Sequence, residues 1–216
     1  MALGSQHTGG VAVRDASSHA AAGISVTAIV AAALAVIRER GVEGLTMRSV
    51  AERLKVRAPS LYHHVRNKDE LLELVARNAF DSFEGDRLAY QQVETLDDWI
   101  AVTTAGSLRL REFYAGHPGL ARLIQARATP YRDEGDGSRS ALVRAQLDAL
   151  VTLGIPEPVA RQIFETCARW TMAAVAAEPL SGPDLFPFGL ELFLRGVRAY
   201  LQPVEGSASG ARPSSS

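Results

Sequence analysis

Apolar residues recur three or four positions apart over most of the chain, a spacing that places side chains on one face of an α-helix. The first such series ends near Gly41, a residue favoured at helix C-termini, and consists of Val26, Ile29, Val30, Ala33, Leu34 and Ile37. No stretch alternates convincingly between apolar and polar residues, as a half-buried strand would. The pattern therefore predicts an all-α protein.

Three further helix starts follow the first helix closely. Thr46 is a good N-cap for a second helix. Pro59, favoured at the first helical position, marks the start of a third. Asn67 is an N-cap for a fourth helix that runs towards Phe83, with Glu70 at its third position.

The rest of the chain predicts more helices, separated by polar or proline-containing breaks. One helix is expected from Asp97 or Asp98 to about 115, and a short helix is expected after it, to about 127. Three more helices are expected at 138–153, 158–177 and 188–201. The expected breaks are 84–94, 117–119, 130–137, 154–156 and 178–187. Residues 1–23 and 204–216 contain few large apolar side chains, which predicts disordered tails.

Composition narrows the class of protein. The chain has 216 residues, of which 47% are hydrophobic and 22% are charged, as in ordinary soluble globular proteins. Its single cysteine makes no internal disulfide and no zinc-binding cysteine pair, which suits a reducing cytoplasm. We expect neither a transmembrane helix nor a secretory signal, because no long apolar run is present.

The charges are distributed unevenly along the chain. The net charge is −1, but residues 24–68 carry eight basic and three acidic residues. A basic segment attached to an acidic body is typical of a protein with an anionic partner. A plain solvated helix face carries the same charge, so the charge alone leaves both interpretations open.

Residues 46–65 hold two short predicted helices separated by residues 55–58, a length that suits a helix-turn-helix. Ala51 is small where two helices cross, and the space beneath is filled by Val56, Leu61 and Val65. A structural αα-hairpin would share this core. It would not require the side chains that face outward, which suit contacts with phosphates and base edges. These outward residues are Arg57, Ser60, Tyr62, His63, His64 and Lys68.

The segment GVEGLTMRSVAERLKVRAPSLYHHVRNKDELLELV, residues 41–75, resembles the DNA-binding segment of the tetracycline-repressor (TetR) family of bacterial transcription regulators. The ordered string LYHHVRNK, residues 61–68, carries much of the likeness. The helix count and the closing FPFGLELFLRGV, residues 186–197, look like the C-terminal domain of the tetracycline-repressor branch. The resemblance implies a three-helix helix-turn-helix DNA-binding domain at 24–75. It further implies a helical ligand-binding and dimerisation domain at 76–203.

The function that the resemblance implies is a homodimeric repressor that a small-molecule effector releases from a palindromic operator in double-stranded DNA. A second interpretation is a non-specific or architectural DNA-binding protein without ligand control. An enzyme is not expected, since the chain has no nucleophile elbow, phosphate loop, zinc-protease helix or dinucleotide-binding glycine pattern. No cofactor or metal is expected either, because adjacent His63 and His64 would point about 100° apart on a helix.

The resemblance also implies which residues contact DNA. Phosphate contacts are implied for Thr46, Tyr62, His64 and Lys68. Base contacts are implied for Arg48, Pro59 and Ser60, while His63 matches a position that reads either base or backbone. A guanidinium such as that of Arg48 can donate two hydrogen bonds to guanine.

Three departures from the family pattern bear on this surface. Lys55 stands where the turn often has glycine, because the backbone there favours positive φ, so Lys55 is expected to be mildly strained or the turn to differ. Met47 and Ala58 replace polar residues of the tetracycline repressor, which predicts a different operator. After His64 the only histidine is His117, which argues against tetracycline as the ligand.

A pocket is expected between helices of the region 99–170. The candidate lining residues are Phe113, Leu123, Gln146, Phe164, Cys167 and Met172, although each is more often plain core. His117 is a further candidate, with a surface position at a helix end as its more ordinary interpretation. In the resembling family the last two helices form a four-helix bundle with their symmetry mates. The dimer candidates on these two helices are Trp170, Ala174, Phe188, Leu192 and Tyr200.

Overall fold

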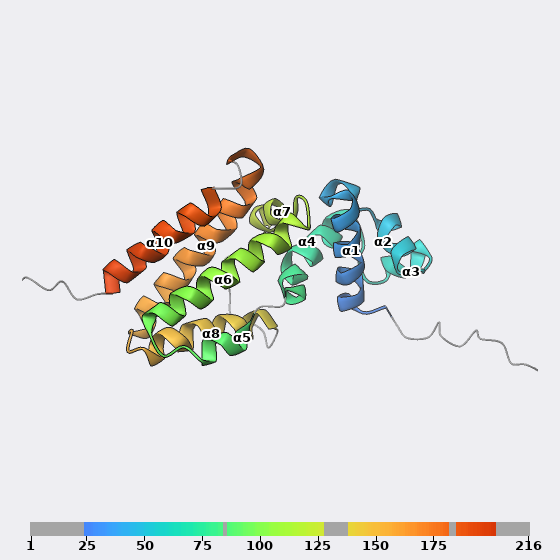
Figure 1. Ribbon diagram of the computed structural model, residues 1–216. Helices are drawn as coiled ribbons and strands as arrows, with labels where there is room; N and C mark the ends of the chain where they lie inside the picture. Colours follow the sequence, from blue (N-terminus) through green and yellow to red (C-terminus); the bar gives the residue numbers. More distant parts are fainter. Residues whose placement is uncertain (1–23, 84–85, 128–137, 182–184, 202–216) are drawn as a thin grey trace, which may run out of the picture.

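The computed structural model describes residues 24–83, 86–127, 138–181 and 185–201, and these ranges contain helices but no strand (Figure 1). The predicted tails and the predicted break at 130–137 lie outside the described residues. No described helix combines the length and apolar character needed to cross a membrane. The helices are α1 (Val26–Arg40), α2 (Met47–Arg53), α3 (Ala58–Tyr62), α4 (Lys68–Asn78), α5 (Arg87–Gln91), α6 (Leu96–Ala115), α7 (Leu120–Arg127), α8 (Ser138–Thr152), α9 (Glu157–Ser181) and α10 (Leu185–Leu201), with 3-10 turns η1 (Val42–Gly44) and η2 (Ala79–Ser82).

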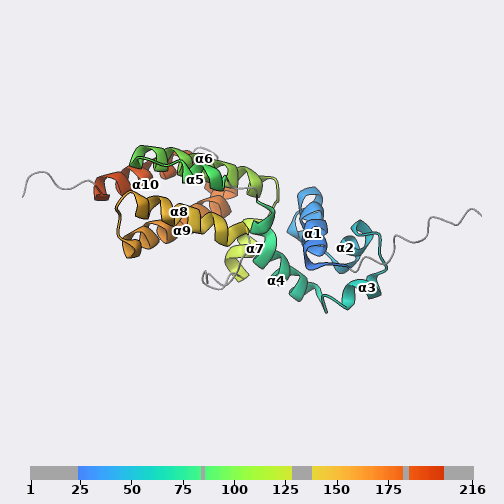
Figure 2. The same cartoon turned by 90° about the horizontal axis from the view of Figure 1, so that it is seen from below.

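The helices gather in two groups joined by α4 (Figures 1 and 2). Helices α1, α2 and α3 lie at one end of the molecule, and α5 to α10 form a longer body. Within the body, α9 packs between α8 and α10, while α6 contacts α8, α9 and α10. The all-α prediction is confirmed for the described residues.

Side-chain caps fix where several helices begin. Thr46 Oγ1 accepts a hydrogen bond from the Ser49 N–H (3.0 Å), and Ser49 Oγ accepts one from the Thr46 N–H (2.9 Å). Asn67 Oδ1 likewise accepts from the Glu70 N–H (2.9 Å). The predicted caps Thr46 and Asn67 are therefore confirmed, and each satisfies backbone donors that a helix start leaves free. Pro59 stands one position later than predicted, since Ala58 opens α3.

Helix α6 begins differently from the prediction, which placed its start at Asp97 or Asp98. Thr95 is the N-cap, and its hydroxyl accepts from the Asp98 N–H (3.1 Å). The Asp98 carboxylate accepts from the Thr95 N–H (2.9 Å) and closes a reciprocal capping box. Hydrogen bonds from Thr95 lower the pKa of the Asp98 carboxyl.

Two predicted breaks are wrong in part. Helix α5 occupies residues 87–91 within the expected break 84–94, and it packs against α8. Its Tyr90 is buried, and the Tyr90 hydroxyl donates to Thr103 Oγ1 of α6 (3.4 Å). Helix α9 continues to Ser181 and α10 begins at Leu185, so the break expected at 178–187 is much shorter. Pro187 lies in the first turn of α10, where its missing N–H has no helical partner to lose.

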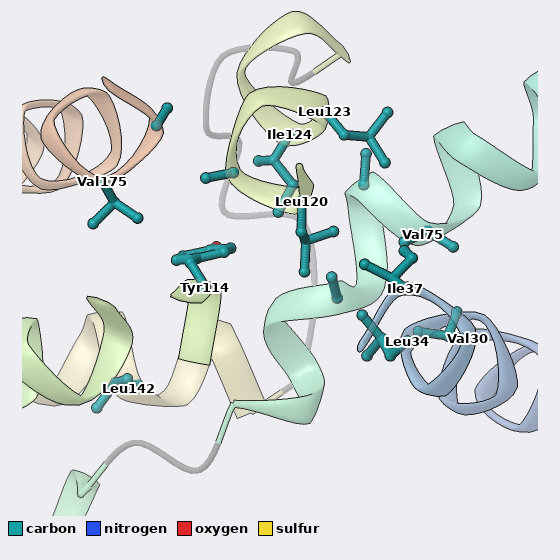
Figure 3. Close-up of a cluster of buried hydrophobic side chains, with 14 of the residues drawn as sticks. Val30, Leu34, Ile37, Val75, Tyr114, Leu120, Leu123, Ile124, Leu142 and Val175 are labelled. Carbon is teal, nitrogen blue, oxygen red and sulfur yellow. The ribbon is translucent and has the colours of Figure 1, made fainter. Parts of the chain in front are cut away.

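One hydrophobic core runs from the α1–α4 end into the body, and α7 lies at its centre (Figure 3). Leu120, Leu123 and Ile124 of α7 lie between Val75 of α4 and the body residues Tyr114 and Val175. Helix α7 contacts α4 and α9 to a similar extent. The packing is therefore continuous from α4 through α7 to α9.

Gly189 of α10 lets that helix approach α9 closely. A Cβ atom at this position would lie 2.5 Å from Cζ2 of Trp170, a distance that real contacts do not tolerate. We expect Gly189→Ala to lower the free energy of unfolding by about 1–3 kcal/mol, because Trp170 must leave its place between α9 and α10. Urea denaturation followed by tryptophan fluorescence measures this change.

Gly196 on the same helix is the matched control. A Cβ atom there meets nothing within 4 Å, so Gly196→Ala should raise stability by about 0.5–1 kcal/mol through helix propensity alone. Equal effects of the two substitutions would show that close approach to Trp170 does not decide the packing of α10.

Candidate nucleic-acid interface

Helices α2 and α3 form a helix-turn-helix around a small buried contact. Ala51 is 3% exposed at their crossing, and Leu61 and Val65 are buried beneath it, as predicted. The Val56 N–H donates to the Ala51 carbonyl (3.0 Å) and so ties the turn back to α2. These contacts fix the orientation of α3 relative to α2.

The eight predicted DNA-contacting residues are all exposed. They lie at the start of α2, along α3 and its C-terminal turn, and at the start of α4, and they are Thr46, Arg48, Pro59, Ser60, Tyr62, His63, His64 and Lys68. Tyr62 is half exposed although it is large and aromatic. Met47, by contrast, is buried, so it packs in the core rather than facing a partner. No group of three or more metal-ligating side chains occurs among the described residues.

Arg48 is the most outward cation of α2, with its side chain 88% exposed. Its Nε donates to Glu52 Oε1 at 2.8 Å, one helical turn further along. This hydrogen bond raises the pKa of the Arg48 guanidinium. The bond uses one edge of the guanidinium and holds the side chain along α2, so contact with a base competes with Glu52.

The turn between α2 and α3 contains a strained residue, as the departure at Lys55 predicts. Lys55 has φ +56°, and it is the one non-glycine residue with positive φ in the described part of the chain. Its N–H still donates to the Glu52 carbonyl (3.1 Å), so the turn keeps its geometry despite the side chain. A Cβ atom in this region of φ costs about 1–2 kcal/mol.

We therefore expect Lys55→Gly to raise the free energy of unfolding by about 0.5–1 kcal/mol, since relief of strain exceeds the added flexibility of glycine. Thermal unfolding at high salt separates this effect from the loss of the lysine charge. Lys55→Val is the matched variant, because a branched Cβ should make the turn less stable than wild type. A stabilising Lys55→Val would contradict the strain at this position.

Two polar contacts join the helix-turn-helix end to the body near α7. Arg127 at the end of α7 donates to the Asp69 carboxylate (2.6 Å), next to the candidate phosphate contact Lys68. The Val42 N–H donates to the Pro118 carbonyl in the α6–α7 turn (3.0 Å). Sequence patterns missed both contacts, because each joins residues more than 50 positions apart and leaves no local signal.

The ligand candidates Phe113 and His117 lie together, but His117 is inside the protein rather than on its surface as the sequence suggested. His117 is 4% exposed, so its expected position on the surface is wrong. Its Nδ1 lies 2.6 Å from the Phe113 carbonyl, which can only accept, so Nδ1 carries the hydrogen. The two rings lie 4.5 Å apart, and Phe83 packs edge-on against Phe113 at 5.8 Å.

The other ligand candidates are spread over three helices. Leu123 is buried on α7, Gln146 is partly buried on α8, and Phe164, Cys167 and Met172 lie on α9. Burial raises the pKa of the Cys167 thiol to about 11, so this side chain behaves as a small neutral hydrophobe. None of the seven candidates lines either of the two grooves described below.

The dimer candidates lie along one side of α9 and α10. Phe188, Leu192 and Tyr200 are 63%, 62% and 71% exposed. Trp170 stacks on Phe193 with ring centroids 6.3 Å apart. A groove of about 650 Å³ runs between the two helices and includes Trp170, Leu192 and Tyr200 in its lining. Large apolar side chains exposed in one row are typical of a protein–protein interface.

A family model described as bacterial regulatory proteins, tetR family, matches residues 29–75. Tetracycline repressor protein class E of Escherichia coli is 30% identical to this chain over 156 residues, which are 72% of this chain and 69% of the repressor. The chain belongs to the TetR family. It is therefore a DNA-binding transcription regulator rather than an enzyme.

Solved structures of TetR-family proteins share this fold. A TetR variant from Acinetobacter baumannii AYE in complex with minocycline matches with a TM-score of 0.63 at 24% identity, over 82% of this chain and 98% of that one. BioQ with its double-stranded DNA operator matches with a TM-score of 0.59 at 24% identity, over 82% and 99%. At such identities the likeness establishes the fold alone.

Proposed function

We propose that this TetR-family protein is a homodimeric repressor that binds a palindromic operator in the bacterial cytoplasm and leaves it when a small molecule binds. The observation that carries the proposal is the capped helix-turn-helix whose eight candidate DNA contacts are all exposed. The segment 24–75 would supply DNA binding, and 76–203 would supply effector binding and dimerisation.

In this proposal the exposed residues divide between positioning and base reading. Thr46, Tyr62, His64 and Lys68 contact phosphates, which fixes the register of the protein on DNA. Arg48, Pro59 and Ser60 face base edges, and His63 adds a contact to base or backbone. Pro59 contributes only an apolar contact, for which a thymine methyl is suited.

Dimerisation is proposed through the exposed side of α9 and α10. A two-fold axis there would place two α3 helices on one face of DNA, and half-sites about 34–36 Å apart correspond to one helical turn. The apolar row of Phe188, Leu192 and Tyr200 supports this choice, since a partner would remove it from water.

The effector is proposed to bind among the internal side chains near Phe113 and His117, with α7 as the element that transmits its effect. The support is the position of α7, which packs on α4 and ends in the Arg127–Asp69 contact beside Lys68. An effector that shifts α7 would then move Lys68 and the helix-turn-helix out of register with phosphates.

Selection of bound sites from a random DNA pool tests the proposal, with the full chain at physiological salt because affinity depends on salt. Enrichment of one palindrome supports a dimeric, sequence-specific regulator. Binding without enrichment favours the architectural alternative. Absence of binding by the ligand-free protein contradicts both.

A further inference from the structure

A second groove lies on the body, away from the α9–α10 face, where the short helix α5 packs against α8. Its volume is about 520 Å³, within the range of small-molecule pockets. The lining comes from these two helices and from a residue two positions after α5. It comprises Arg87, Tyr90, Gln91, Val93, Ala141, Arg144, Ala145, Asp148, Ala149 and Thr152.

The floor of this α5–α8 groove is apolar. Tyr90 and Val93 are 6% and 7% exposed, and Ala149 is buried beside them. Ala141 and Ala145 precede Ala149 at intervals of four residues, so small side chains form one row of α8 along the groove. Their size leaves a space in which a flat ring can lie against the floor.

Two arginines line the walls of the groove. Arg87 on α5 and Arg144 on α8 make no ion pair with any described residue. Asp148 stands four residues after Arg144. Arg48 and Glu52 form an ion pair at the same spacing, but Arg144 and Asp148 do not. The lining therefore has a net positive charge, with two guanidinium groups against one carboxylate.

We propose that the α5–α8 groove binds a small aromatic carboxylate. The ring would lie on Tyr90, Val93 and the alanine row, while Arg87 and Arg144 donate hydrogen bonds to the carboxylate from opposite walls. Tyr90 presents a neutral ring, because burial raises the pKa of its hydroxyl to about 12. This site is additional to the internal effector site, and its occupancy does not depend on operator binding.

Titration of the full chain with 1-naphthoate, followed by calorimetry, tests the site. We expect one naphthoate per chain. Binding of the uncharged analogue 1-naphthylmethanol should be about fivefold to tenfold weaker, which is the contribution expected of a charge-assisted hydrogen bond at a partly exposed site.

Three variants locate the binding. Arg144→Gln should weaken naphthoate about fivefold and leave 1-naphthylmethanol unchanged. Ala145→Leu should abolish binding of both by filling the groove, and Asp148→Asn should tighten naphthoate binding. Arg77→Gln on α4 is the matched control, since it removes an exposed arginine outside the groove and should change neither affinity.

Naphthoate binding that is equal in wild type and Arg144→Gln, or that survives Ala145→Leu, would overturn the proposal. Absence of naphthoate binding by the wild-type chain would overturn it as well. The outcome is separate from that of the repressor proposal. Naphthoate binding without enrichment of an operator would support this site and contradict the proposed function. Enrichment of an operator without naphthoate binding would support the proposed function and contradict this site.

Discussion

Replacing Arg48 with alanine is expected to weaken binding to the selected operator by about tenfold to a hundredfold and to remove discrimination at one base pair of each half-site. The guanidinium is the most exposed cation of α2, and it is held along the helix by Glu52. Because a dimer would use this contact twice, the loss occurs at both half-sites.

Electrophoretic mobility shifts with the operator and with single-base variants measure both effects. Lys68→Ala should instead weaken all sequences about equally and reduce the salt dependence of binding, as a phosphate contact does. Arg77→Ala is the control, since Arg77 is also an exposed arginine paired with a glutamate one turn away. A uniform loss in Arg48→Ala would assign this residue to the phosphate backbone instead.

Glu52 offers a second check on the same contact. Glu52→Gln removes the carboxylate that holds Arg48 along α2, and it also removes a negative charge from the proposed DNA-binding surface. Operator binding should therefore tighten, with discrimination at the Arg48 base pair retained. Weaker binding in Glu52→Gln would indicate that Glu52 positions Arg48 for base reading rather than competing for it.

Replacing Leu192 with glutamate is expected to convert the proposed dimer into a monomer, with the dissociation constant for dimerisation raised by about a thousandfold or more. Leu192 is 62% exposed on α10, in the row that we assign to the dimer interface. In a symmetric interface the new carboxylate is buried once on each subunit, without a partner. Each buried charge destabilises the dimer by about 2 kcal/mol or more, so the two together cost several kcal/mol.

Sedimentation velocity measures the oligomeric state, and operator binding should fall in parallel because a monomer contacts one half-site only. A charged residue in place of Ala174, on the facing side of α9, should also weaken dimerisation and operator binding. Leu88→Glu is the control, since Leu88 is 60% exposed on α5, outside the proposed interface. A Leu192→Glu protein that remains dimeric would move the interface to another surface.

Local chemistry explains why much of the helix-turn-helix could be predicted. Thr46 and Asn67 cap helices whose own third residues they bind, so each signal lies within four residues of sequence. The positive φ of Lys55 was expected from the family pattern, in which this turn position often holds glycine. The family pattern then assigned outward positions to residues that are exposed.

Elements without a strong local signal were missed. Helix α5 is too short to show a periodic pattern, although Asp86 caps it by accepting a hydrogen bond from the Ala89 N–H (3.0 Å). So short a helix depends mainly on tertiary packing, here against α8 and through the buried Tyr90, whose hydroxyl donates to Thr103 of α6. Pro187 suggested a loop, although proline is compatible with the first turn of a helix. In both places tertiary contacts and helix ends outweighed residue propensity.

The sequence by itself determined the helix class, the caps, the strained turn and the family, because each depends on residues close together in the chain. Only the tertiary structure decided that His117 is buried against Phe113, that Arg127 reaches Asp69, and that α5 and α8 enclose a groove. The last two features join segments that are far apart in sequence. His117 and Phe113 are only four residues apart, and the burial of His117 depends on the segments that pack around them. The energy of all three features comes from contacts that exist only after the helices have packed, so no local pattern encodes them.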